Sequence, residues 1–146
     1  MTVVFSRVAR VAIAFIMVVG AGSCASPSAP SVNVPFTVND VRVGTGATAV
    51  VGSTVQVNYT GWLYDDTKPD KKGEQFDASA AGRPFVFWVG AGQVIAAWDQ
   101  GLVGMKVGGL RRLIVPASMA YGRNGSGNLI PPNASLVFDI ELLGLF

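Results

Sequence analysis

Apolar and polar residues alternate along several short stretches of the chain, a pattern typical of β-strands that bury one face. In residues 54–60, valine and tyrosine alternate with polar side chains. In residues 135–143, leucine, phenylalanine and isoleucine occupy one face, whereas Asp139 and Glu141 occupy the other. The pattern predicts further strands in three regions: the alternating segment that begins at Phe36, residues 85–89 and residues 111–115.

One stretch has the spacing of a helix instead. Apolar residues at positions 94, 95, 98 and 102 share one face and Gly101 lies near the end, which predicts a short helix over 94–102. A single amphipathic helix cannot cover its own apolar face, but an antiparallel sheet that curves over it buries both surfaces. The predicted fold class is therefore α+β, with a curved antiparallel sheet of about five strands wrapped around one short α-helix.

Two charged stretches accompany these elements. Residues 65–73 (Asp-Asp-Thr-Lys-Pro-Asp-Lys-Lys-Gly) combine charges with turn-forming residues and are predicted to form an exposed loop. Arg111 and Arg112 are adjacent and are predicted to lie on a solvated strand face. Neither stretch is the extended basic surface, with interleaved aromatic residues, that nucleic-acid binding requires.

The first 23 residues have the pattern of an export signal. Arg7 and Arg10 precede an uncharged apolar run at 11–21, and small residues follow that run. The run is shorter than the roughly 20 residues that a membrane-spanning helix needs. The sole cysteine, Cys24, comes next, and residues 21–24 (Ala-Gly-Ser-Cys) resemble a bacterial lipobox. We therefore predict a lipoprotein signal peptide over 1–23, with lipidated Cys24 as the mature N-terminus.

Two other interpretations of this region stay open. Ala21 and Ser23 also fit the small-x-small rule for plain secretory cleavage, and the run could remain as an uncleaved anchor. Residues 24–35 are rich in serine, proline and alanine and predict a flexible tether, so that the domain proper covers 36–146. The expected location is the cell envelope, anchored to a membrane through the lipid on Cys24, with a secreted soluble protein as the alternative.

Composition narrows the chemistry that the domain can perform. The 146 residues suffice for one domain plus a tail. Without the first 23 residues the formal charge of +2 becomes zero, since nine basic residues remain against nine acidic ones. The chain has no histidine, which excludes a Ser-His-Asp triad, a Cys-His pair and histidine metal sites. No metal or cofactor is therefore expected, and an enzymatic reaction of this domain would use neither a thiol nucleophile nor a metal ion. Rotation about an X-Pro peptide bond is such a reaction.

Five short motifs occur in an order that resembles one known family. They are residues 57–61 (Val-Asn-Tyr-Thr-Gly), 76–79 (Phe-Asp-Ala-Ser), 94–98 (Val-Ile-Ala-Ala-Trp), 120–122 (Ala-Tyr-Gly) and 129–132 (Leu-Ile-Pro-Pro). From about Phe36 to Phe146 the chain resembles the FKBP family of peptidyl-prolyl cis-trans isomerases. The resemblance implies an isomerase that assists the folding of exported proteins through an apolar pocket, without covalent catalysis. Proline-containing proteins or peptides would be its substrates, and a rapamycin-type macrolide a ligand.

The resemblance also implies a role for individual residues. In the family, the tryptophan forms the pocket floor, the backbone N–H of the isoleucine binds a ligand carbonyl, and the tyrosine of Ala-Tyr-Gly offers a hydroxyl donor. The residues carried over as catalytic are Asp77, Tyr121, Tyr59 and Trp98. Those carried over as substrate-binding are Phe76, Phe85, Val94, Ile95, Ile130 and Phe138.

The chain departs from the family pattern in three places. Ala80-Ala81-Gly82 stands where the family often has an arginine that pairs with its aspartate, and Arg83 is the nearest candidate replacement. Residues 65–73 look like an insertion near the pocket rim. The histidine common before Ile-Pro-Pro is absent, with Ser126 or Gly127 at its place. The first departure concerns the orientation of the aspartate, and the other two concern substrate range.

Other assignments remain open beside the isomerase. The same pocket could belong to a non-catalytic module or chaperone that holds proline segments, or the domain could be a structural lipoprotein without a ligand. Phe138 fits the core and the pocket equally well, whereas Phe87 is assigned to the core. We expect a monomer that binds no nucleic acid.

Overall fold

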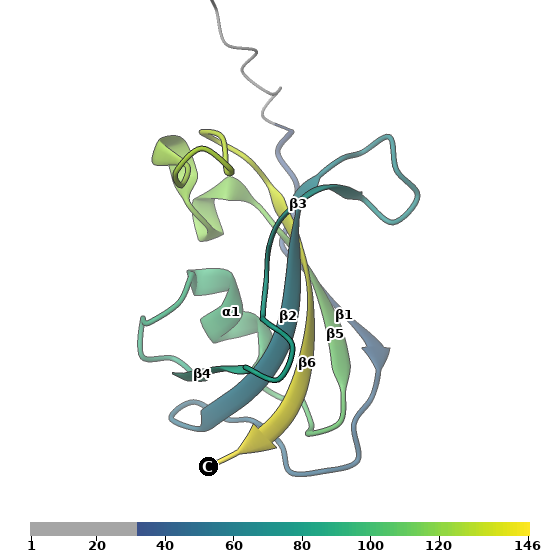
Figure 1. Cartoon of the computed structure of the whole chain (residues 1–146), viewed down its shortest axis with the longest axis vertical. Helices are drawn as coiled ribbons and strands as arrows, with labels where there is room; N and C mark the ends of the chain where they lie inside the picture. The colour runs from purple at the N-terminus through teal and green to yellow at the C-terminus, as the bar shows by residue number, and fades with distance from the viewer. Residues whose placement is uncertain (1–31) are drawn as a thin grey trace, which may run out of the picture.

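An antiparallel sheet forms the frame of the protein in the computed structural model, which describes residues 32–146 (Figure 1). Its strands are β1 (Thr37–Arg42), β2 (Thr54–Tyr64), β3 (Lys72–Ala78), β4 (Phe85–Trp88), β5 (Leu110–Val115) and β6 (Leu136–Leu145). The order across the sheet is β1-β5-β6-β2-β3, and β4 also pairs with β2. The long strand β2 carries β6 along one side, and β3 and β4 one after the other along the opposite side.

The short helix α1 (Ala96–Gly101) packs against one face of this sheet, which curves around it (Figure 1). The face toward the helix is apolar, and Val57, Leu113 and Ile140 on it are fully buried. A Cβ atom on Gly101 would meet Cδ2 of Leu113 at 2.8 Å, so this glycine allows the helix to approach β5 closely. The predicted fold class is confirmed, with six strands instead of about five.

Strand β3 is the element that the hydrophobic pattern missed. Its sequence, Lys-Gly-Glu-Gln-Phe-Asp-Ala, contains one large apolar residue and no regular alternation. The strand lies at the edge of the sheet, and its register with β2 shifts twice. A bulged edge strand needs no continuous apolar face, so alternation does not reveal it. The predicted loop over 65–73 was therefore wrong at its end, because Lys72 and Gly73 belong to β3.

Arg111 is buried, which contradicts its predicted place on a solvated strand face. Its side chain forms two hydrogen bonds with the carboxylate of Asp40 on β1, at 2.6 and 3.0 Å. Its Nη1 also donates to the backbone oxygens of Gly101 and Val103 at the end of α1. Arg111 thus joins the edge strand β1 and the helix to β5. The guanidinium can be buried because its donors are satisfied.

The opposite face of the sheet carries a cluster of three charged side chains. Arg112 on β5 and Lys72 on β3 both bond to the carboxylate of Asp139 on β6, at distances of 2.6 to 2.9 Å. The ammonium of Lys72 also lies 3.9 Å from the ring centroid of Trp62. These ion pairs cross-link three strands on the face that does not contact the helix.

The chain packs against the sheet before β1 begins. Val34 is only 5% exposed, and the hydroxyl of Ser135 donates to the carbonyl oxygen of Val32 at 3.4 Å. Of the predicted tether at 24–35, only residues 32–35 are described, and the predicted signal peptide and Cys24 lie outside the described residues. In the part of the chain that the structure describes, no helix has the length and apolarity needed to cross a bilayer.

Candidate functional site

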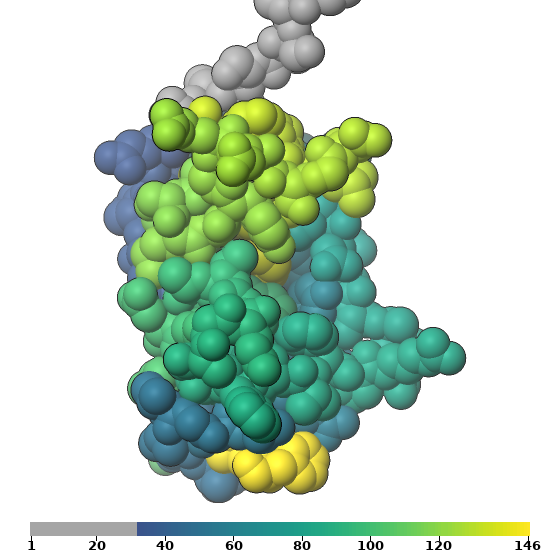
Figure 2. Space-filling model, turned by 90° about the vertical axis from the view of Figure 1, so that its left-hand side faces the viewer, coloured from purple at the N-terminus to yellow at the C-terminus, as the bar shows by residue number. Residues whose placement is uncertain are grey.

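A cavity of about 240 Å³ lies between α1, the sheet and the segment that follows β5. In Figure 2 the surface is hollowed between the yellow-green segment that contains the 3-10 helices η1 (Ala117–Met119) and η2 (Gly122–Asn124) and the teal and green segments of β3, β4 and α1. Ten residues line the cavity: Tyr59, Phe76, Asp77, Phe85, Gln93, Val94, Ile95, Trp98, Tyr121 and Phe138. All of these except Gln93 were predicted from the sequence, so the fold gathers segments spread over eighty residues of chain into one site.

Trp98 forms an aromatic floor for this cavity. Its ring is 5% exposed and is approached edge-on by the rings of Tyr59 and Phe138, with centroids 5.0 and 5.3 Å away. The indole N–H is buried and has no hydrogen-bond partner among residues 32–146. Buried donors are rarely left unpaired in a purely structural position. The arrangement therefore favours a part for Trp98 in the cavity as well as in the core.

Phe138 belongs to both the core and the cavity wall. It is buried on β6 and lines the cavity, where its ring meets that of Phe76 edge-on at 5.6 Å. Gly61 on β2 leaves the space for this pair, because a Cβ atom there would lie 2.7 Å from Phe76 and 2.9 Å from Phe138. Phe87 lies in the core as predicted, at 3% exposure.

The polar edge of the cavity is built on β2 and β3. The hydroxyl of Tyr59 donates to Oδ2 of Asp77 at 2.7 Å, and the backbone N–H of Ala78 donates to Oδ1 at 2.9 Å. Burial, together with this hydrogen bond to a carboxylate, raises the pKa of Tyr59 well above that of a free tyrosine. The Tyr59 phenol therefore stays protonated and acts as a donor.

Tyr121 completes this edge from the segment between η1 and η2. It is 39% exposed, and its hydroxyl forms no hydrogen bond within residues 32–146. Burial first, and the negative charge of Asp77 second, raise the pKa of Tyr121. Its hydroxyl is thus a protonated donor with no partner in the described chain. It lies near the carboxylate of Asp77, which already accepts a hydrogen bond from Tyr59.

A backbone donor faces no internal acceptor at the start of α1. Ile95 is the N-cap residue, and its carbonyl oxygen accepts the N–H groups of Trp98 and Asp99 at 2.9 and 3.4 Å. Its own N–H is bonded to no other group in the part of the chain described. A peptide carbonyl in the cavity could accept from this N–H without breaking an existing bond, which agrees with the role implied by the family resemblance.

The loop before α1 is held by a side chain that the sequence did not single out. Both carboxylate oxygens of Asp99 accept backbone N–H groups, from Gly90 at 2.8 Å and from Gly92 at 3.0 Å. Oε1 of Gln93 accepts the backbone N–H of Trp88 at 3.0 Å. Asp99 and Gln93 thus set the path of the segment that brings Val94 to the cavity.

Ile130 lies beside the cavity instead of on its wall. It is buried, and with Phe76, Asp77 and Tyr121 it lines an adjoining hollow formed by residues 126–130. Its backbone N–H and carbonyl oxygen both bond to Ser126, at 3.1 and 2.9 Å, which closes this loop on itself. Arg83 forms no ion pair with Asp77, and no other residue among 32–146 does so.

Three residues of the site were missed from the sequence. Gly61 was quoted only as the end of a motif, and its use appears only when the rings of Phe76 and Phe138 meet over it. Asp99 and Gln93 accept hydrogen bonds from residues five to nine positions away, in a loop without periodicity. An acidic residue at the fourth position of a short helix, soon after a Gly-x-Gly segment, was the one local signal for the contact of Asp99.

The arrangement suits a reaction without covalent intermediates. The cavity is lined mainly by aromatic and aliphatic residues, with Asp77 and Gln93 as polar exceptions, and its donors are the hydroxyl of Tyr121 and the N–H of Ile95. It can hold an apolar ring, orient the amide next to it and keep water away from that amide. These are the requirements for turning a peptide bond, not for breaking one.

Several known proteins are similar to this chain in sequence. Residues 46–143 match the family model of FKBP-type peptidyl-prolyl cis-trans isomerase. The FK506-binding protein of Neisseria meningitidis serogroup B is 44% identical over 110 residues, which cover 75% of this chain and 94% of that protein. FK506-binding protein 2 of Dictyostelium discoideum is 41% identical over 129 residues, which cover 87% of this chain and 89% of that protein.

Solved structures lead to the same family. AtFKBP13 superposes with a TM-score of 0.64 at 37% identity, over 75% of this chain and 91% of that one. FkpA from Escherichia coli superposes with the same TM-score at 39% identity, over 75% of this chain and 47% of that one.

Proposed function

Since the chain belongs to the family of FKBP-type peptidyl-prolyl cis-trans isomerases, we propose that the cavity around Trp98 is its active site and that exported proteins are its substrates. The family assignment is established by the match over residues 46–143. The roles of the individual residues are part of the proposal, and they rest on the geometry of the site.

The reaction is limited by amide resonance. The barrier to rotation about a peptide bond is roughly 18–20 kcal/mol, and an X-Pro bond isomerises unaided in tens to hundreds of seconds. At the twisted transition state resonance is lost and the charge separation of the amide falls. An apolar cavity therefore binds the twisted amide better than the planar one. A reduction of the barrier by about 8 kcal/mol would accelerate the rotation about a millionfold.

The residues of the cavity have separate roles in the proposed binding and rotation of the substrate. The proline ring sits on Trp98, and the N–H of Ile95 holds the carbonyl of a neighbouring peptide group. The hydroxyl of Tyr121 donates to the substrate near the rotating bond. The carboxylate of Asp77, held by Tyr59, keeps this edge polar and orients the bound chain. Phe76, Phe85, Val94 and Phe138 exclude water, and Ile130 supports the neighbouring loop.

One observation carries the assignment of the site. Tyr59, Asp77 and Tyr121, which come from three separate segments, meet at one edge of a cavity whose other lining residues, Gln93 excepted, are aromatic or aliphatic. The hydroxyl of the exposed Tyr121 is available at this edge to donate to a bound chain. The same cavity is the expected site for a rapamycin-type macrolide, and relatives in Neisseria and Dictyostelium carry FK506 binding in their names.

The test is the cis-to-trans isomerisation of short X-Phe-Pro and X-Leu-Pro peptides, with and without a rapamycin-type macrolide. We expect turnover that the macrolide abolishes, and a severalfold lower kcat/KM for Asp77→Ala and for Tyr121→Phe, with both variants folded. Full activity in both variants would refute the roles given to these residues. Macrolide binding without any turnover would instead support a proline-binding module or chaperone, the alternative that the missing arginine partner of Asp77 favours.

The location in the cell envelope is a separate proposal. It is supported by the basic start, the apolar run at 11–21 and the single cysteine at position 24. Metabolic labelling with a fatty-acid analogue should mark the wild-type protein in bacterial envelopes and leave Cys24→Ser unlabelled. A labelled Cys24→Ser variant, or an unlabelled wild type released from the cells, would contradict lipid anchoring. The second result would support plain secretory cleavage.

A further inference from the structure

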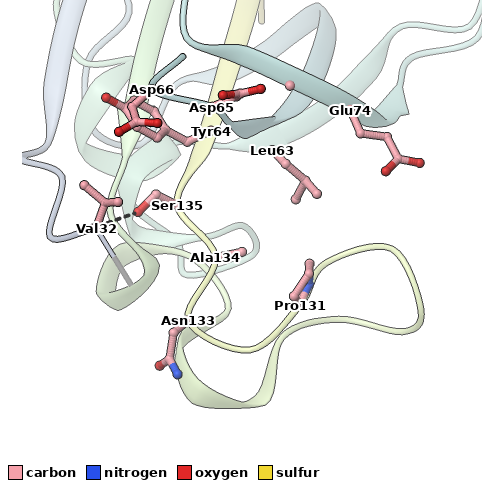
Figure 3. Close-up of a pocket in the computed structure, with 11 residues that line it drawn as sticks. Val32, Leu63, Tyr64, Asp65, Asp66, Glu74, Pro131, Asn133, Ala134 and Ser135 are labelled. Atoms are coloured by element: carbon pink, nitrogen blue, oxygen red, sulfur yellow. Dashed lines mark hydrogen bonds between the residues drawn. The ribbon is translucent and has the colours of Figure 1, made fainter. Parts of the chain in front are cut away.

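A second cavity, of about 340 Å³, lies at the end of the sheet next to the first described residue (Figure 3). It forms where the base of the β2–β3 loop (residues 63–66, Gly73 and Glu74), residues 131–135 and Val32 come together. The backbone N–H of Tyr64 bonds to the carbonyl oxygen of Ser135 at 2.8 Å, and the hydroxyl of Ser135 bonds to Val32. These bonds tie the three segments to one another, so the cavity has fixed walls.

The inside of this groove is mostly apolar. Leu63 and Pro131 lie on opposite sides of it in Figure 3, with Ala134 nearby. Leu63 continues the row of inward-facing residues on β2 and packs partly against the core. Such a lining suits an aliphatic chain more than a polar group.

The rim of the groove is acidic. Asp65 and Asp66 stand on one side of it and Glu74 on another (Figure 3). Hydrogen bonds from the hydroxyl and the backbone N–H of Thr67 lower the pKa of Asp65, which is therefore ionised at neutral pH. The side chains of Asp66 and Glu74 form no ion pair and no hydrogen bond within residues 32–146.

The charges of Lys68 and Lys71 act on Asp65 and help to lower its pKa, but neither lysine forms an ion pair with Asp66 or Glu74. Lys71 bonds to the backbone oxygen of Asp66 at 3.0 Å, and not to its carboxylate. Lys72, the residue that follows, points to the other face of the sheet, where it pairs with Asp139. The carboxylates of Asp66 and Glu74 therefore both lack an ion-pair partner among residues 32–146.

The groove and the active site share no lining residue, but the chain connects them at two points. Pro131 follows Ile130, which lines the hollow beside the catalytic cavity, and Glu74 precedes Phe76 of the cavity wall by two residues on β3. Two residues of a strand span roughly 7 Å. An extended polypeptide with its proline over Trp98 could thus place a side chain in the groove within a few residues of that proline.

We propose that this groove is a subsite for a lysine or arginine side chain of the substrate polypeptide, close in sequence to the proline that is isomerised. The aliphatic stem of such a side chain would lie on Leu63 and Pro131, while its cationic end would meet Glu74. The inference rests on the proposed active site and adds a preference for positive charge to it. The β2–β3 insertion, which supplies most of the rim, would then act in substrate selection.

Matched peptides test the proposal. Peptides with one Phe-Pro bond carry lysine, its uncharged analogue norleucine, or alanine at the second, third or fourth position before or after the proline. The full-length chain is assayed in a mild detergent at low salt. We expect lysine to raise kcat/KM about twofold to fivefold over norleucine at one of these positions, the range that a partly exposed ion pair supports.

Variants of the protein test whether Glu74 in the groove causes the preference for lysine. Glu74→Gln should remove most of the lysine preference, and Glu74→Lys should reverse it, while the alanine peptide is turned over as by the wild type. Asp70→Asn is the matched control, because it removes one charge from the same hairpin outside the groove. Equal kcat/KM for lysine and norleucine at every position would overturn the inference, and so would a preference that survives Glu74→Gln. Failure to turn over any peptide would instead overturn the proposed active site.

Discussion

Tyr59 supplies the only side-chain hydrogen bond that Asp77 receives within residues 32–146, from its hydroxyl to Oδ2 at 2.7 Å. The family commonly pairs this aspartate with an arginine, and here Ala80-Ala81-Gly82 occupies the corresponding place. A neutral phenol therefore holds the carboxylate, across two neighbouring strands. This contact links the frame of the sheet directly to the polar edge of the cavity.

Removal of this donor should weaken catalysis more than folding. In Tyr59→Phe the aromatic contacts with Trp98 remain and Asp77 loses its partner. We expect kcat/KM to fall roughly threefold to tenfold, which corresponds to the net contribution of a typical hydrogen bond, about 0.5–1.5 kcal/mol, with a nearly unchanged melting temperature. Tyr64→Phe is the matched control, because the Tyr64 hydroxyl forms no hydrogen bond in the described chain. An unchanged kcat/KM in Tyr59→Phe would mean that Asp77 needs no orientation.

Gly61 should tolerate no side chain. The added methyl of Gly61→Ala would have to displace the rings of Phe76 and Phe138, which lie 2.7 and 2.9 Å from its position. Overpacking of this kind costs about 1–3 kcal/mol, and it should also lower kcat/KM because both rings line the cavity. Urea unfolding and peptide kinetics measure the two effects. Gly144→Ala is the control, since its Cβ atom would meet no heavy atom closer than 3.6 Å.

Loss of Arg111 should destabilise the whole domain. Arg111→Met keeps a long apolar side chain but leaves Asp40 and the carbonyl oxygens of Gly101 and Val103 without their donor. We expect the free energy of unfolding in urea to fall by about 2–4 kcal/mol. The exposed Arg123→Met should change it by less than about 0.5 kcal/mol. Similar stabilities for the two variants would show that the buried guanidinium is dispensable.

At acidic pH the free energy of unfolding of the domain should fall, because Asp139 becomes protonated. Burial alone would raise the pKa of Asp139, but hydrogen bonds from Arg112 and Lys72 outweigh burial and hold it below the ordinary value of 3.8. The carboxylate therefore stabilises the fold above that value, and the stabilisation is lost as the pH falls through the lower pKa of the folded state.

The corresponding measurement is the free energy of unfolding between pH 7 and pH 2.5. Asp139→Asn should be less stable than the wild type at neutral pH by about 1–2 kcal/mol, because Arg112 and Lys72 lose their shared partner. Below pH 4 the two curves should converge, since the wild-type carboxyl also becomes neutral. Curves that stay parallel down to pH 2.5 would show that Asp139 does not titrate in this range.

Regular alternation was a reliable guide where a strand has one buried and one solvated face. The pattern placed β6 almost to its ends, because Leu136, Ile140 and Leu142 face the helix while Glu141 faces outward. It failed for β3, whose irregular register at the sheet edge puts no demand on alternate residues. The helix began two positions later than predicted, since Ile95 serves as its N-cap.

The site residues were located by family motifs and not by periodicity. The five motifs contain seven of the ten cavity-lining residues, and the family resemblance added Phe85 and Phe138, but neither gave a signal for Gly61, Asp99 or Gln93 as structural supports of the cavity. They also left the partner of Asp77 open between Arg83 and none. The hydrogen bond from Tyr59 settles this point, and it depends on the pairing of β2 with β3.

The sequence by itself determined the fold class, the family and the identity of most cavity residues, because hydrophobic period and motif order are local properties of a chain. Only the tertiary structure decided that Arg111 is buried against Asp40, 71 residues away. It also decided that Glu74 and Pro131 border one groove. Burial and charge pairing depend on which strands become neighbours in the sheet. The hydrophobic pattern of one strand does not indicate which strands lie beside it.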